Sequence, residues 1–104
     1  MKPDGAKDRA DLHLLDVRER DEWQAGHIAG SQHIPLGQLR VRLAEVPKDR
    51  TILAVCRHGN RSDAAVRGLR TLGYTAENLE GGVTAWKQAG LPLESEDGRP
   101  GRVI

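Results

Sequence analysis

The chain of 104 residues has a single cysteine, no phenylalanine and no long apolar run. One cysteine excludes an internal disulfide, which fits a reducing compartment. With only two Trp and one Tyr, the core must be built from Leu, Val, Ile and Ala. No stretch approaches the roughly 18 apolar residues that a membrane span needs, so we expect no membrane partner. Residues 1–8 are polar and unlike a signal peptide, so a cytoplasmic location is expected.

The chain also has almost no net charge, with 16 basic residues against 15 acidic ones. This balance gives no reason to expect a nucleic acid partner. His13 and His33 lack the spacing of metal ligands, so we expect neither a metal nor a cofactor. The length predicts one domain. We divide the chain into a short polar segment at 1–11, a domain at 12–94 and a polar tail at 95–104. The stretch 94–101, with two glycines and a proline, is expected to be mobile.

Short strands and helices alternate four times along the chain. We expect strands at 12–17, 31–34, 51–55 and 75–79. We expect helices at 19–25, 36–46, 61–72 and 82–89. This alternation predicts an α/β domain with an open, mostly parallel sheet. In such sheets the functional site lies beyond the carboxyl ends of the strands, which is where Cys56 and Asp16 fall.

The most informative stretch is the loop Cys56–Ser62, Cys-Arg-His-Gly-Asn-Arg-Ser. Its thiol ends a strand and faces the amino end of the next helix, where free N–H groups and the helix dipole stabilise a thiolate. Arg57 and Arg61 add positive charge, which lowers the pKa of the thiol and suits an anionic substrate. Gly59 lets the backbone curl so that successive N–H groups converge on the sulfur. Ser62 either caps the helix or donates to the loop.

The roles of several nearby residues stay open at this point. Arg61 either binds the substrate or braces the loop through a carboxylate. His58 has the pKa for acid–base chemistry, but at the tip of the loop we favour a solvated side chain. Asn60 belongs to the same loop. Asp16 and Arg18 are expected to support the site, as an ion pair or by holding loop N–H groups.

Three parts of the chain resemble the motifs of rhodanese domains. The first part consists of Leu15–Arg18, Glu22-Trp23, Gly26–Ser31 and Ile34-Pro35; the second is the loop Cys56–Ser62, and the third is Leu79–Trp86. Their order and spacing resemble single-domain rhodaneses, also called thiosulfate sulfurtransferases. The resemblance covers residues 12–94. It implies an open parallel sheet with helices on both faces, and a cysteine that carries sulfur as a persulfide.

The resemblance implies a donor such as thiosulfate or another sulfane-sulfur compound, and an acceptor such as cyanide or a thiol. A second possibility is a relay module that passes a persulfide to a sulfur-accepting protein. The third is a phosphatase-like enzyme. Four residues separate Cys56 from Arg61, whereas the related phosphatases have five and so a wider cradle, which argues against phosphate chemistry.

Two departures from the family pattern bear on the donor. Arg57 stands where mercaptopyruvate sulfurtransferases usually have a small uncharged residue. Glu22 stands where tandem-domain rhodaneses tend to have an arginine, and a carboxylate there repels an α-keto acid. Both favour a small inorganic sulfur anion. Residues 1–11 are also too short for the strand and helix with which many members begin. One sheet edge is therefore expected to be bare or to be covered by another part of the chain, for which 102–104 is a candidate.

Overall fold

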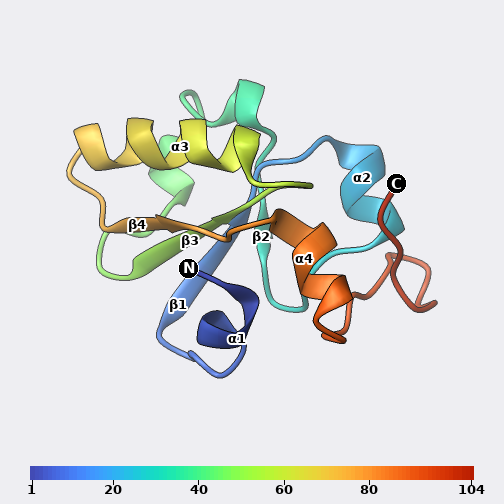
Figure 1. Cartoon of the computed structure of the whole chain (residues 1–104). Helices are drawn as coiled ribbons and strands as arrows, with labels where there is room; N and C mark the ends of the chain where they lie inside the picture. The colour runs from blue at the N-terminus through green and yellow to red at the C-terminus, as the bar shows by residue number, and fades with distance from the viewer.

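A computed structural model describes residues 1–104 (Figure 1). The four strands are all parallel and stand in the order β2-β1-β3-β4. They are β1 (Leu12–Asp16), β2 (Gln32–His33), β3 (Thr51–Val55) and β4 (Ala76–Asn78). The helices are α1 (Pro3–Ala6), α2 (Arg20–Ala25), α3 (Asn60–Thr71) and α4 (Gly82–Gln88), with 3₁₀ turns η1 (Leu36–Gln38) and η2 (Leu43–Glu45). The expected open parallel sheet is confirmed. None of the helices has the length and apolar character needed to cross a bilayer.

The central strand β3 separates two apolar cores. Its side chains alternate, so Ile52 and Ala54 face one core while Leu53 and Val55 face the other. α3 and the 3₁₀ turns cover the first face, and α1 and α4 cover the second (Figure 1). All four of these side chains are at most 1% exposed. A strand buried on both faces holds its carboxyl end, where Cys56 lies, in a fixed place.

The segment 36–46 is not the single α-helix that its apolar spacing predicts. It forms η1 and η2 instead. Four of its apolar residues form two pairs spaced i, i+3, which places both members of a pair on one face in a 3₁₀ turn as well as in an α-helix. They still pack on the core of α3: Leu36, Leu39, Leu43 and Val46. Gly37 lies inside the first turn, and glycine is unfavourable in the interior of a helix, so one continuous α-helix over this segment is disfavoured.

The edge of the sheet beside β4 is occupied by Met1. Its amino group donates to Asn78 O at 2.8 Å, and its carbonyl accepts from Glu80 N at 2.9 Å. This is the hydrogen-bond pattern of a parallel strand, reduced to one residue. The edge is therefore covered by Met1 and not by residues 102–104. Arg102 N donates instead to Ala25 O at 2.9 Å, beside α2.

The tail is tied to the loop that follows α2, although its composition predicts mobility. His27 and Glu94 exchange both backbone hydrogen bonds at 2.9 Å. Gly101 is buried, and a β-carbon there would lie 2.7 Å from Leu93. Close backbone contact of this kind needs glycine. Hydrogen bonds formed across this contact therefore hold the tail against α2.

Candidate functional site

The candidate nucleophile, Cys56, directly follows β3 and is 1% exposed. Two groups donate to its Sγ: Gly59 N at 3.1 Å and Ser62 Oγ at 3.2 Å. Gly59 is the residue that caps α3, with φ +107°. In that left-handed conformation a side chain is strained, so glycine is the residue that lets the loop turn its N–H back to the sulfur.

The pKa of the Cys56 thiol is lowered by the loop N–H groups that the sequence indicated and by the Ser62 hydroxyl, while Arg57 and Arg61 are not among the main causes. Burial is the largest single influence and raises this pKa. The Ser62 hydroxyl and the backbone N–H groups of Ser62, Gly59 and His58 together lower it by more. Hydrogen bonds to the charged form, rather than adjacent arginines, thus dominate the stabilisation of a thiolate here.

Arg61 is bound by a carboxylate. Its Nη1 and Nη2 atoms donate to the two oxygens of Glu22 at 2.7 and 2.8 Å. This bidentate pair lowers the pKa of Glu22 to about 2, chiefly through the Arg61 hydrogen bonds. The pKa of Arg61 is raised, first by Glu22 and to a smaller extent by the charge of Cys56. Of the two roles left open by the sequence, the bracing of the loop is the one that this geometry shows.

Asp16 and Arg18 form a fully buried ion pair at the end of β1. Arg18 Nη2 is 2.7 Å from Asp16 Oδ2, and both side chains are at most 1% exposed. The same nitrogen donates to Gly26 O at 2.7 Å. The pair therefore joins the sheet to the end of α2, which carries Glu22. Asp16 and Arg18 have no hydrogen bond to the Cys56 loop, so their contribution to the site is indirect.

The motif that starts α4 closes over the cysteine loop. Val83 N donates to Cys56 O at 2.9 Å, and Thr84 N donates to Arg57 O at 3.1 Å. Gly82 has φ +62°, and a β-carbon there would lie only 2.2 Å from Cys56 O. Glycine is thus required at position 82 for two reasons, its backbone conformation and the close approach of the loop.

Sequence reasoning missed Asn78, the last residue of β4. Its Oδ1 accepts from Ser62 Oγ at 2.6 Å, and its Nδ2 donates to Gly59 O at 3.0 Å. Ser62 does not cap α3. Of the two roles left open for Ser62, the structure shows donation within the loop. Position at the carboxyl end of a parallel strand was the only sequence signal that pointed to Asn78.

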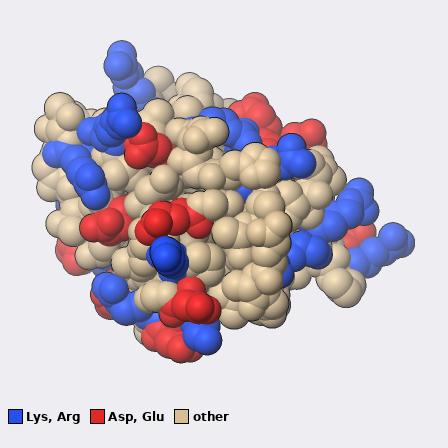
Figure 2. All heavy atoms as spheres, viewed as in Figure 1, with Lys and Arg blue, Asp and Glu red and all other residues tan.

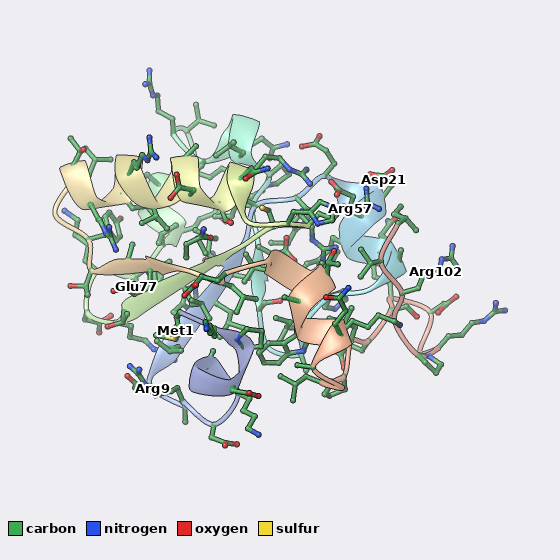
Figure 3. All side chains as sticks on the ribbon, in the orientation of Figure 1. Met1, Arg9, Asp21, Arg57, Glu77 and Arg102 are labelled. Atoms are coloured by element: carbon green, nitrogen blue, oxygen red, sulfur yellow. The ribbon has the colours of Figure 1, made fainter.

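Arg57 and His58 are exposed and line a hollow of about 420 Å³ beside the loop. Arg57 lies above α4 in the view of Figure 3. The remaining lining residues are Thr84, Lys87, Gln88 and Val103, so the hollow has two permanent cations and no carboxylate. Basic side chains also gather along the side formed by the C-terminal segment (Figure 2). Asn60 is exposed at the start of α3. The structure has no group of three or more His, Cys, Asp or Glu side chains that could hold a metal.

The sequence model of the rhodanese-like domain family matches residues 4–89 of this chain. A sulfurtransferase of Allochromatium vinosum is 37% identical over 92 residues, which cover 88% of this chain and 86% of that protein. A rhodanese-related protein of Thermoplasma volcanium superposes with a TM-score of 0.87 at 36% identity, covering 92% of this chain and 97% of that one.

Other relatives are longer than this chain. An HTH-type transcriptional regulator of Mycobacterium tuberculosis is 40% identical over 90 residues, which cover 85% of this chain and 40% of that protein. A putative sulfur carrier protein of Bacillus subtilis is 37% identical over 76 residues, covering 72% of this chain and 41% of that protein. The same kind of domain thus occurs both alone and as part of larger proteins.

Proposed function

The chain belongs to the rhodanese-like domain family, and from this premise we propose that it is a sulfurtransferase in which Cys56 carries sulfur as a persulfide. The donor is thiosulfate or a similar sulfane-sulfur anion, and the acceptor is cyanide or a thiol. The observation that carries this proposal is the set of donors aimed at Cys56 Sγ, from Gly59 N and Ser62 Oγ. These donors stabilise the thiolate that both half-reactions require.

The reaction divides one difficult transfer into two displacements. In the first, the electron pair of the Cys56 thiolate forms a bond to the outer sulfur of thiosulfate. The sulfur–sulfur bond of the donor breaks, and its electron pair leaves with sulfite. In the second, the acceptor attacks the outer sulfur of the persulfide, and the electron pair of the broken bond returns to Cys56 Sγ.

The hollow beside the loop supports an anionic donor. Arg57 has no ion-pair partner, and Lys87 donates only to Gly101 O at 3.0 Å. Both carboxylate oxygens of Glu22 accept hydrogen bonds from Arg61, so Glu22 gives no argument against an α-keto acid. The expected preference for thiosulfate over mercaptopyruvate therefore depends on Arg57.

Intact mass spectrometry after incubation with thiosulfate tests this proposal. The wild type should gain the mass of one sulfur atom, and subsequent cyanide should remove it and release thiocyanate. Cys56→Ser is the matched control, because it changes a single atom and removes the nucleophile. A wild type that gains no mass, or a Cys56→Ser variant that gains the same mass, contradicts the proposal.

A protein-to-protein persulfide relay is the second candidate. It is supported by relatives in which this domain makes up less than half of a longer protein, one of them described as a putative sulfur carrier. Such a relay still loads Cys56, but small acceptors discharge it slowly. The rate of discharge by cyanide and by small thiols, measured on the loaded protein, separates the two. Rapid turnover with a small acceptor favours the enzyme.

A further inference from the structure

The Ser62 hydroxyl has one hydrogen and two acceptors within reach. Its Oγ lies 2.6 Å from Asn78 Oδ1 and 3.2 Å from Cys56 Sγ. A hydroxyl donates one hydrogen bond at a time, so it serves either the amide or the sulfur. Ser62 is fully buried and Cys56 is 1% exposed. A change of partner needs only a rotation of the hydroxyl hydrogen.

The orientation of the Asn78 amide is fixed by its other partner. Gly59 O is a carbonyl and only accepts, so the nitrogen of the amide must face it, at 3.0 Å. Asn78 Oδ1 therefore faces Ser62, and it too only accepts. The same amide consequently anchors Gly59, whose N–H contacts Sγ at 3.1 Å, and competes with Sγ for the hydrogen of Ser62.

We propose that Asn78 is a positioning residue that controls, through Ser62, how strongly the site stabilises the Cys56 thiolate. In the thiol form the S–H donates to Ser62 Oγ, and Ser62 donates to Asn78. In the thiolate form the hydrogen of Ser62 turns to the sulfur, because hydrogen bonds to a charged acceptor are the stronger ones. Asn78 Oδ1 then loses its donor. This loss opposes ionisation, so Asn78 holds the thiolate less stable than Ser62 alone would make it.

This competition affects the two half-reactions in opposite ways, and this consequence rests on the proposed function. When Sγ bonds to the donor sulfur it loses its charge and becomes a weak acceptor, so the hydrogen of Ser62 returns to Asn78. When the acceptor breaks that bond, charge returns to Sγ and the hydrogen turns back. A thiolate of lower pKa is a weaker nucleophile, so it attacks the sulfur donor more slowly. It is also a better leaving group when the acceptor attacks the persulfide. Asn78 thus favours loading over discharge.

Several charged groups around Cys56 set the background for this effect. Arg57 and His58 belong to the loop, and Arg61 of α3 is paired with Glu22 of α2. The buried pair of Asp16 and Arg18 stands at the end of β1, and α4 brings Lys87 to the hollow beside Arg57. None of these groups is changed in the variants below, so differences between variants report on Asn78 and Ser62.

The test measures the pH dependence of Cys56 alkylation by iodoacetamide in Asn78→Ala and Asn78→Asp, each with Ser62 and with Ser62→Ala. Both substitutions remove the donor to Gly59 O, so a loosened loop would shift the alkylation midpoint in the same direction in both. We expect opposite directions. Asn78→Ala frees the hydrogen of Ser62 and lowers the midpoint by about 0.4–1 pH unit. Asn78→Asp binds that hydrogen more firmly and raises the midpoint.

The double variants isolate the part that passes through Ser62. With Ser62→Ala, the effect of Asn78→Ala should vanish, and Asn78→Asp should keep only the effect of its charge. Shifts of equal size with and without Ser62, or shifts of the same direction in Asn78→Ala and Asn78→Asp, overturn the inference. If Asn78→Ala does not fold, the nearly isosteric Asn78→Asp carries the test alone, since its shift must be larger when Ser62 is present.

Alkylation needs no sulfur donor, so this result is independent of the proposed substrate. Coupling between Asn78 and Ser62 without any mass gain from thiosulfate would refute the donor and leave the inference standing. Mass gain from thiosulfate without coupling between Asn78 and Ser62 would support the donor and overturn the inference. Where thiosulfate does load the protein, Asn78→Ala should load more slowly at high pH and discharge faster to cyanide than the wild type.

Discussion

At the scale of single residues, the two arginines of the loop have different surroundings. Arg61 uses both of its terminal nitrogens on Glu22. Arg57 is exposed, forms no ion pair and faces a hollow without a carboxylate. The thiolate is stabilised mainly by Ser62 and by backbone N–H groups. Binding of the donor and ionisation of Cys56 are therefore expected to depend on different residues.

Replacement of Arg57 by alanine should separate these two properties. The loss of a charge-assisted hydrogen bond to a dianion, on the order of 1.5–3 kcal/mol, should lower kcat/KM for thiosulfate by about 10- to 150-fold. The midpoint of Cys56 alkylation should stay close to that of the wild type. Steady-state kinetics with thiosulfate and cyanide, together with the alkylation profile, measure both.

Arg40→Ala is the matched control for that variant, since Arg40 is exposed and lies outside the loop, between η1 and η2. It should behave as the wild type in both assays. Mercaptopyruvate should be a poor donor for the wild type. A better rate with mercaptopyruvate than with thiosulfate would show that Arg57 does not select the donor.

At the scale of elements, the parts defined by a local pattern were predictable. β3 was located correctly at 51–55, and α3 within one residue at each end, because an apolar β-branched run and an amphipathic face are properties of neighbouring residues. The two 3₁₀ turns within 36–46 were not predictable, because apolar residues spaced i, i+3 fit a 3₁₀ helix as well as an α-helix. The loop itself was recognised from its composition.

Asn78 could not be predicted in the same way. It ends the short strand β4 and meets Ser62, 16 residues earlier, only because β4 lies beside β3 in the folded sheet. The bidentate bond between Glu22 and Arg61 spans 39 residues and depends on where the Asp16–Arg18 pair holds the end of α2. Contacts of this kind follow from the placement of whole elements, which no local pattern contains.

The contact between the start of α4 and the cysteine loop gives a prediction for Gly82→Ala. Gly82 and Gly90 both have positive φ, +62° and +80°, so alanine is strained at either position. That strain costs about 1–2 kcal/mol. Only at Gly82 would the new β-carbon also overlap backbone, 2.2 Å from Cys56 O, whereas Gly90 has nothing within 4 Å.

Gly90→Ala is therefore the matched control for Gly82→Ala. We expect Gly90→Ala to lose about 1–2 kcal/mol of unfolding free energy and to load sulfur normally. Gly82→Ala should lose more stability and load more slowly, because the loop must move. Urea unfolding and intact mass after incubation with thiosulfate measure the two effects. Equal loading by the two variants would show that the close approach of Gly82 to Cys56 O does not matter for the site.

The length of the loop gives a second prediction at this scale. Four residues lie between Cys56 and Arg61, and each added peptide brings another N–H to the rim of the cradle. We expect no useful hydrolysis of an aryl phosphate by the wild type. One glycine inserted after Gly59 should widen the cradle and permit weak Cys56-dependent hydrolysis, at the expense of sulfur loading. Phosphate release by the wild type without thiocyanate formation would favour the phosphatase alternative.

At the scale of the whole molecule, α2 is held from three sides. The Arg18 side chain binds Gly26 O at its end, the tail pairs with His27, and Arg61 reaches across from α3 to Glu22. The ion pair of Glu22 and Arg61 thus joins two helices and also braces the loop of Cys56. Protonation of the Glu22 carboxylate should therefore change both the stability of the fold and the geometry of the site.

Glu22 should make stability depend on acid pH. Its pKa falls from the ordinary 4.5 to about 2 in the folded chain, chiefly through the hydrogen bonds from Arg61. Because the folded pKa is the lower one, the stabilisation is fully present above about pH 4.5. It is lost as pH falls toward 2. The difference corresponds to at most about 3 kcal/mol, and solvent at Arg61, which is 37% exposed, reduces it.

Urea unfolding between pH 7 and pH 3, for the wild type and for Glu22→Gln, measures this contribution. The amide is nearly isosteric with the carboxylate and does not titrate. Glu22→Gln should be less stable than the wild type at pH 7, and its unfolding free energy should fall less steeply below pH 5. The gap between the two curves should narrow from about pH 5 down to pH 3, because over this range the Glu22 carboxylate is protonated in the unfolded chain while it stays mostly ionised in the folded one. Coincident curves over the whole range would show that the Glu22–Arg61 pair adds nothing to the stability of the fold, and that its effect is confined to the position of the loop.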